Sequence, residues 1–194
     1  MGTKADSIKA KKRARQKKTR QAAQASRGSR PGTSGPTKVR LDVVRAWPVW
    51  ECYLSENWHE QGATVHAIIT RRSGQGALAV ATVQADLGVR GVVEHNLVGG
   101  LQEADLNRAV MAMSAEGVGM VMREPELVAK VLTTAAAYGV EMGFELPKGW
   151  ERVVRFIDDI DVSAASDEIL TGIPGAPEVK PGMLAGLRQR LFGG

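Results

Sequence analysis

Cysteine is scarce in this sequence. Cys52 is the only one in 194 residues, which excludes an intramolecular disulfide framework and a zinc site built from several thiolates. A chain without disulfides needs no oxidising compartment, so we expect a cytoplasmic protein. With 43% hydrophobic residues, the chain is long enough for one buried core and too short for several ordinary domains.

Long apolar runs are missing as well. No stretch approaches the roughly 18 consecutive apolar residues of a membrane span, and the N-terminus lacks the apolar centre of a secretory signal. The basic N-terminus also suits a mitochondrial presequence, but Ile8 is its only large apolar residue after Met1, so an amphipathic face is lacking. We expect no membrane partner.

Phosphate-binding loops are also absent. The sequence contains no Gly-Lys-Ser or Gly-Lys-Thr, and Gly117-Val118-Gly119 lies between two helical patterns rather than after a strand. This excludes the phosphate-loop enzymes. No other cofactor motif is present, so we predict no cofactor.

Basic and acidic residues are unevenly distributed along the sequence. Residues 1–40 hold 13 of the 26 Lys/Arg and one of the 21 Asp/Glu, a formal charge of +12. Residues 41–194 hold the other 13 Lys/Arg and 20 Asp/Glu, a formal charge of −7. This asymmetry indicates a polyanionic partner, nucleic acid or a ribonucleoprotein, without naming a reaction.

The cations of this basic arm concentrate in residues 4–20, where nine of 17 positions are Lys or Arg. Such a segment cannot build a core, and its self-repulsion favours disorder until phosphates neutralise it. It has no aromatic residue for stacking on single strands, so we expect low sequence specificity. The alternative is a solubilising extension with no ligand. The residues we predict to bind nucleic acid are Lys9, Lys11, Lys12, Arg13, Arg15, Lys17, Lys18 and Arg20.

Residues 26–37 are rich in Gly, Pro and Ser, which is typical of a flexible tether. We therefore expect residues 1–37 to form a disordered basic arm and linker. The globular domain is expected to begin near Lys38, where Val39, Leu41 and Val43 alternate with polar neighbours in a β pattern.

The pattern stays β-like to about residue 98. Residues 49–54 form a short apolar run, and residues 63–71 and 77–85 flank a Gly-containing turn, which predicts a hairpin. A further β run around Val92 is expected to close at Gly99-Gly100.

The second half predicts helices. Residues 103–115 have apolar positions near helical spacing. A stronger helix begins at Glu124-Pro125, where proline suits the first helical position, and stops at Gly143. A further short helix is expected around residues 150–157.

These patterns predict an α+β fold, in which an N-terminal antiparallel β-rich half is packed by C-terminal helices. The α+β globular domain is expected over residues 38–171. A Pro/Gly-rich spacer and a short amphipathic helix are expected over residues 172–194.

Two segments carry a family resemblance, Asp86-Leu87-Gly88-Val89-Arg90 and the helix Glu124-Pro125-Glu126-Leu127-Val128-Ala129, continuing to Ala137-Tyr138 and Gly143-Phe144. Together with neighbouring residues over roughly 49–146, they resemble a small family of bacterial proteins of unknown function. That family usually has a cysteine before Leu-Gly-Val and a Tyr-Ala helix end; here the cysteine is absent and Gly139 follows Tyr138. The resemblance implies no catalytic residues.

The tryptophans and methionines are interpreted as residues that pack in or beside the core. The four tryptophans are expected at the boundary of the core, with Trp47 beside Pro48 as an alternative aromatic platform for a partner. The methionines are interpreted as adaptable packing: Met111, Met113, Met120 and Met122.

Cys52 is the candidate nucleophile if the protein is an enzyme. It is the only thiol, and His59 or His66 would have to serve as its base. However, Cys52 lies in an apolar run, Val49 to Leu54, and such a cysteine behaves as a small buried hydrophobe. We therefore predict no catalytic residue, and keep an unrecognised site around Cys52, His59 and His66 as the alternative.

Metal binding has only weak candidates. His59, Glu60, His66, Asp86 and His95 could converge in space, but their spacing matches no metal signature, and we predict no metal site. The acidic run Asp158, Asp159 and Asp161 is interpreted as a solvated turn after a short helix; magnesium binding and attraction to the basic arm are the alternatives.

The C-terminal segment predicts a docking helix. Its apolar residues fall at helical spacing beyond three prolines, and the candidate docking residues are Met183, Leu184, Leu187 and Leu191. Leu184-Ala185-Gly186-Leu187-Arg188 faintly resembles the cargo-loading tails of encapsulin guests. The alternative is a helix folded onto its own domain.

The sequence therefore predicts a binding protein rather than an enzyme. Its first predicted partner is nucleic acid or a ribonucleoprotein, held by the basic arm. A protein-interaction adaptor acting through the C-terminal helix and an enzyme with an unrecognised site are the alternatives.

Overall fold

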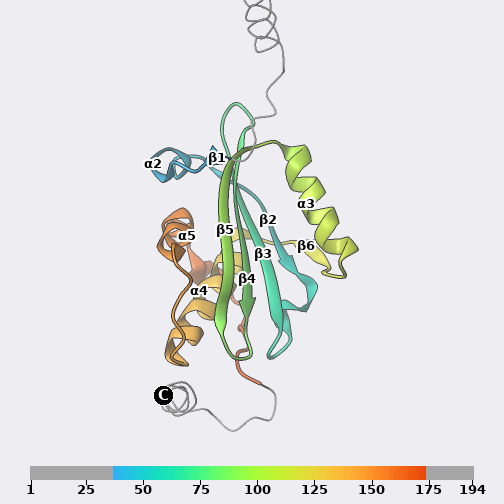
Figure 1. The fold of residues 1–194 in the computed structure, drawn as a ribbon, viewed down its shortest axis with the longest axis vertical. Coiled ribbons are helices and arrows are strands. Elements are labelled where there is room, and N and C mark those ends of the chain that lie inside the picture. The colour runs from blue at the N-terminus through green and yellow to red at the C-terminus, as the bar shows by residue number, and fades with distance from the viewer. Residues whose placement is uncertain (1–36, 174–194) are drawn as a thin grey trace, which may run out of the picture. The chain divides into compact units, whose positions relative to one another are not determined.

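The computed structural model describes residues 37–173. They form a six-stranded antiparallel sheet with helices on both faces (Figure 1), which confirms the predicted α+β fold. The strand order is β1-β5-β4-β3-β2-β6. The strands span β1 Thr37–Lys38, β2 Val49–Ser55, β3 Thr64–Arg72, β4 Leu78–Asp86, β5 Gly91–Leu101 and β6 Met120–Met122. Thr37, which was expected at the end of the disordered arm and linker, instead pairs with Gly99 in the sheet. The rest of the predicted arm lies outside the described residues, as does the predicted C-terminal docking helix.

The β3–β4 hairpin is the most regular part of the sheet. The strands pair without interruption from Thr64 opposite Asp86 to Arg72 opposite Leu78. The hairpin turn is closed by Ser73, whose hydroxyl accepts the Ala77 backbone N–H at 3.0 Å. Gly76 has a φ of +85°, which side chains rarely tolerate. The predicted hairpin is confirmed, with each strand displaced by one residue.

Strand β5 is longer than the sequence predicts. It runs through Gly99 and Gly100 to Leu101 instead of ending before them. At Gly99 a Cβ would lie 3.2 Å from Cγ2 of Val39, so this glycine lets the chain after β1 pack closely on the strand. The Gly-Gly pair is therefore part of the strand rather than its end.

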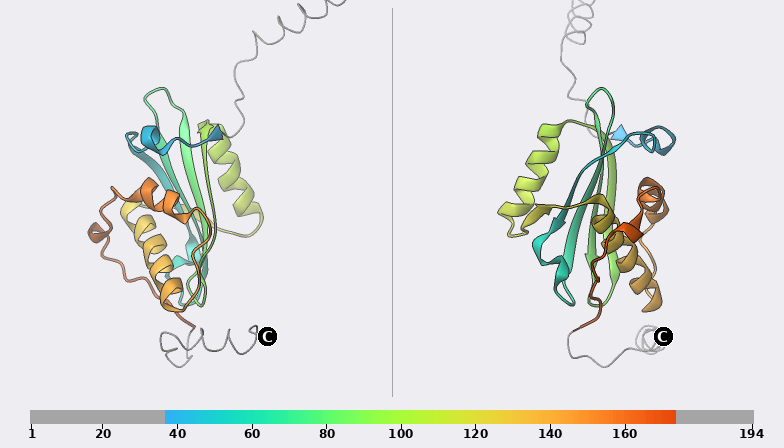
Figure 2. Two further views of the ribbon diagram at one scale, coloured as in Figure 1. Left: turned by 60° about the vertical axis from the view of Figure 1, so that its left-hand side comes forward. Right: turned by 180° about the vertical axis from the view of Figure 1, so that it is seen from behind.

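Helices cover the two faces of the sheet unequally (Figures 1 and 2). Helices α4, Pro125–Glu141, and α5, Trp150–Ile157, pack on one face and enclose the larger core with inward residues of β2 to β5. Helix α3, Glu103–Ala115, lies on the other face. There Leu106 packs with Ile68, Leu78 and Val80 in a smaller core.

The helix bounds follow the local signals. In α3 the Asp105 carboxylate accepts the Gln102 backbone N–H at 2.9 Å, which caps the first turn. In α4, Pro125 occupies the first turn, and Gly143, with a φ of +83°, follows the end. All three predicted helices are confirmed.

Two short elements contradict the sequence pattern. Residues Leu41–Val44 form helix α2 instead of continuing a strand, because Leu41 and Val44, three residues apart, are both buried and Val43 is exposed. Strand β6 lies between α3 and α4, where only helices were expected. It exists through pairing with β2, where Tyr53 lies opposite Met122.

The β4–β5 turn packs closely against helix α4. The Asp86 carboxylate accepts the backbone N–H groups of Gly88 and Val89, at 2.8 and 3.0 Å. The Tyr138 hydroxyl donates to the Gly88 carbonyl at 2.7 Å, and a Cβ on Gly139 would lie 2.6 Å from the Arg90 carbonyl oxygen. The turn that contains Asp86 to Arg90 and helix α4 thus contact each other directly.

The described chain enters and leaves at opposite ends of the sheet (Figure 2). Thr37 lies opposite Gly99, which itself lies opposite Ala79 near the start of β4. After α5 the chain follows α4, where Lys130 Nζ donates to the Ala165 carbonyl at 2.8 Å. It reaches the far end of β4, where the Gly172 N–H donates to the Leu87 carbonyl at 2.8 Å.

Candidate functional site

Cys52 lies inside the larger core. Its exposed fraction is 1%, as the apolar run predicts. Burial raises the pKa of the thiol to about 12, so the nucleophilic thiolate is disfavoured. Its neighbours in that core include Ile69, directly opposite on β3, and Ala67.

His66 lies on the other face of the sheet from Cys52. Val65 and Ala67, its neighbours on β3, both belong to the larger core, so His66 points to the α3 face. His59 is exposed in a 3-10 helix, Glu56–His59, with its ring against Trp58 at 5.8 Å between centroids. The structure therefore does not bring the thiol and either histidine together.

The candidate metal ligands are also dispersed. Within residues 37–173 no group of three His, Cys, Asp or Glu side chains could hold a metal ion. Asp86 is occupied by the turn that it caps. His95 packs edge-on against Trp150 on the side of α5, and its Nδ1 is the one buried side-chain nitrogen or oxygen without a hydrogen-bond partner in the described part of the chain.

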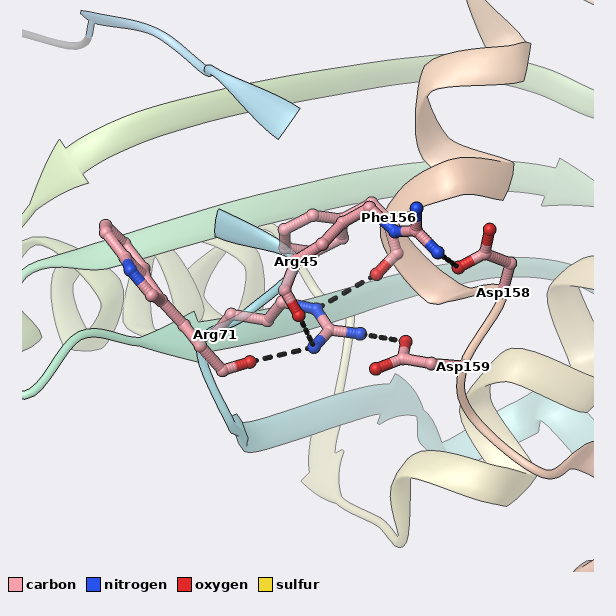
Figure 3. Close-up of polar contacts among 6 residues, drawn as sticks. Arg45, Arg71, Phe156, Asp158 and Asp159 are labelled. Carbon is pink, nitrogen blue, oxygen red and sulfur yellow. Dashed lines mark hydrogen bonds and ion pairs between the residues drawn. The ribbon is translucent and has the colours of Figure 1, made fainter. Parts of the chain in front are cut away.

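The carboxylates of the acidic run after α5 make contacts within the protein, and Figure 3 shows those of Asp158 and Asp159. Asp158 pairs with Arg45 at 2.7 Å, and Asp159 pairs with the buried guanidinium of Arg71. Asp161 accepts the N–H and hydroxyl of Ser163, which lowers the pKa of its carboxyl. The predicted turn is present, but these carboxylates are hydrogen-bonded within the protein rather than merely solvated.

Arg71 is the group that sequence analysis missed. Its side chain is 1% exposed. Nε donates to the Phe156 carbonyl at 3.0 Å, and Nη1 donates to the carbonyls of Arg45 and Trp47 at 3.2 and 2.8 Å. The strand alternation that places Ala67 and Ile69 in the core also places Arg71 there, so a signal existed.

The face of the sheet on which α3 lies also has a cleft lined by polar side chains. This cleft of about 150 Å³ lies beside Met113 of α3. Its polar lining consists of His66, Thr82, Gln84, Glu94 and Asn96, with His95 at its edge. None of the first five side chains has a hydrogen-bond partner within the described chain.

The tryptophans are not equally placed. Trp150 is 4% exposed and Trp47 and Trp58 are half-buried, whereas Trp50 at the start of β2 is 43% exposed. The guanidinium carbon of Arg72 lies 4.3 Å from the centre of the Trp50 ring, and Arg72 Nη2 lies 3.5 Å from Oε2 of Glu103. The exposed aromatic is therefore Trp50 and not Trp47.

The methionines are only partly packing residues. Met113 and Met120 contact the smaller core, but Met111 on α3 and Met122 on β6 are exposed. The prediction of adaptable packing is right for two of them and wrong for the other two.

Most cations of the described body are engaged within it. Residues 37–173 carry 12 Lys/Arg and 19 Asp/Glu, a formal charge of −7. Five arginines form ion pairs, while Lys130 and Arg152 donate to backbone carbonyls. Lys38, Arg90, Arg123, Lys148 and Arg155 have no such partner among residues 37–173. The eight predicted nucleic-acid-binding residues and the four predicted docking residues lie before residue 37 and after residue 173.

Comparison of the chain with family models, curated proteins and solved structures finds no match. In the described part of the chain, no helix has the length and apolar character needed to cross a membrane.

Proposed function

We propose that the protein binds nucleic acid, alone or in a ribonucleoprotein, through its basic N-terminal arm, without catalysis and with low sequence specificity. The observation that carries the proposal is the separation of charge, +12 in residues 1–40 and −7 in residues 41–194. Nine cations within 17 residues would neutralise several phosphates and release their counterions, which supplies most of a non-specific affinity.

The charge of the body supports the proposal that the arm is the part that binds nucleic acid. Its formal charge is −7, and seven of its 12 cations are engaged in internal contacts. The net charge of the body repels a polyanion, so most of the attraction has to come from the arm. The proposal also places the protein in the cytoplasm, where its single thiol stays reduced.

The test is a salt titration of nucleic-acid binding by the full chain and by an arm-neutral variant. In that variant Lys9, Lys11, Lys12, Arg13, Arg15, Lys17, Lys18 and Arg20 are all replaced by Gln, which reduces the formal charge of residues 1–40 from +12 to +4. The full chain should lose affinity as salt rises, with a logarithmic slope of about −0.7 to −0.9 per phosphate contacted. The arm-neutral variant should bind weakly at every salt concentration.

A matched control keeps the arm and neutralises exposed body cations instead. Arg90, Arg123, Lys148 and Arg155 have no side-chain partner in the described residues, so their replacement by Gln should leave the fold and most of the affinity intact. The proposal is overturned if the arm-neutral variant binds as tightly as the full chain, or if the affinity does not respond to salt.

We propose as a second function that residues 183–191 dock on another protein. The favouring observation is that the chain is hydrogen-bonded to the body as far as Gly172, while Ile173 is exposed, so the Pro-rich segment starts from a fixed point at the surface. The test fuses residues 173–194 to an unrelated soluble carrier. A co-purifying protein that depends on Leu184 and Leu187 supports docking, and a carrier that retains none contradicts it.

A further inference from the structure

Trp50 is unusual among the four tryptophans. It belongs to neither hydrophobic core, and 43% of its surface is exposed. Burial of an indole is among the largest favourable contributions that one side chain makes to folding. Trp50 is in neither core, and the exposed part of its ring can contact a ligand.

The position of the indole is fixed by its neighbours. The Arg72 N–H donates to the Pro48 carbonyl at 3.1 Å, which holds the start of β2 against β3. The Arg72 guanidinium lies over the ring at 4.3 Å and is oriented by Glu103 on α3. The Arg72 guanidinium thus lies against one face of the ring. Because this contact already fixes the side chain, ligand binding costs little conformational entropy at Trp50.

The site lies at the end of the sheet where the basic arm joins the body. One row of paired residues crosses five strands, from Thr37 through Gly99, Ala79 and Arg71 to Val49, the neighbour of Trp50. Four strand spacings of about 4.8 Å make this roughly 19 Å.

We propose that Trp50 and Arg72 form a stacking site for single-stranded nucleic acid. The inference rests on the proposed function and specifies its partner. A base of a single strand stacks on the indole, and the neighbouring phosphate meets the Arg72 guanidinium. Bases in a duplex are already stacked on each other, so a duplex makes the arm contacts alone.

The test measures tryptophan fluorescence and affinity in the full chain. The probes are oligo(U) RNA and oligo(dT) DNA of about 12 nucleotides, and a duplex of the same length. Both single strands should quench the fluorescence, and the duplex should not. Trp50→Ala should weaken single-strand binding about five-fold or more and leave duplex binding and the salt slope unchanged.

Three further variants separate stacking from structural damage. Trp50→Phe should keep most of the affinity but lose the quenching, because phenylalanine still stacks while the reporting indole is gone. Trp58→Phe should keep both. Arg72→Gln should weaken single-strand binding and lower the salt slope by about one phosphate contact. A thermal unfolding curve for each variant shows whether the body remains folded.

The outcomes distinguish the two proposals. If Trp50→Ala binds single strands as tightly as the full chain, the stacking site is wrong while arm binding stands. Equal quenching by the duplex and the single strands also overturns the site. If the arm-neutral variant binds as well as the full chain, the proposed function itself fails.

Discussion

Arg71 and Asp159 connect the centre of the sheet to the chain that follows helix α5. The guanidinium is 1% exposed, whereas the carboxylate is 49% exposed. Three carbonyl oxygens and the face of Phe156, at 5.4 Å, complete the surroundings of the cation. A buried charge of this kind is tolerated only because nearly all its donors are paired.

Arg71→Met should destabilise the body by about 3 to 5 kcal/mol, because the carbonyls of Arg45, Trp47 and Phe156 lose their donor. Asp159→Asn should cost less, about 1 to 3 kcal/mol, since water reaches the carboxylate. Urea denaturation measures both. Arg40→Gln breaks a fully exposed ion pair and serves as the control with little expected change. Equal stability of the Arg71 variant and the wild type would show that the cation is not needed.

Gly139→Ala should destabilise the protein by about 2 kcal/mol. In an open helix the same change stabilises by roughly 1 kcal/mol, but here the new Cβ would lie 2.6 Å from the Arg90 carbonyl and 3.0 Å from the Gly91 Cα. The measurement is the thermal unfolding midpoint. Gly74→Ala is the control, because no atom lies within 4 Å of its added Cβ. A stabilised Gly139→Ala variant would disprove the close contact.

Cys52 should react with alkylating reagents only when the protein opens. Its burial raises the pKa from 9.0 to about 12, so the folded state favours the neutral thiol. This preference stabilises the fold fully below pH 9.0 and is lost as the pH rises towards 12. The free energy of unfolding should therefore fall less steeply in Cys52→Ala over that range. Rapid native-state labelling at neutral pH would contradict the burial.

Truncation should separate the body from the segment beyond it. Removing residues 174–194 should leave the thermal unfolding midpoint unchanged if that segment docks on another protein. Removing residues 166–194 should lower it, because the Gly172 and Gln61 hydrogen bonds and the packing of Ile169 are lost. A lower midpoint for the shorter deletion would indicate that the C-terminal helix packs on its own body.

Periodicity was enough to predict the long elements. The β3–β4 hairpin alternates around a Gly-containing turn, and α4 carries proline at its start and glycine after its end. These signals are local and agree with the packing. The short elements depend on distant partners instead. The three-residue β6 is a strand only because β2 lies beside it, and Leu41 to Val44 fits a helix or a strand until its buried pair is known.

The candidate sites were harder to predict, because the spacing of residues in the sequence does not show on which face of the sheet each side chain lies. Cys52 and His66 lie on the neighbouring strands β2 and β3, yet their side chains point to opposite faces of the sheet. Arg71 and Arg72 are adjacent in the sequence, yet one is buried among carbonyls and the other stacks on Trp50. Only the strand register separates these roles.

The opposite placement of Thr37 and Gly172 has a consequence for where the two terminal segments leave the body. Ala79, in the row of Thr37, and Leu87, the partner of Gly172, are eight residues apart along one direction of the chain, or about 26 Å. The segment before Thr37 and the segment after Ile173 therefore leave the body at points that lie about that far apart along the sheet.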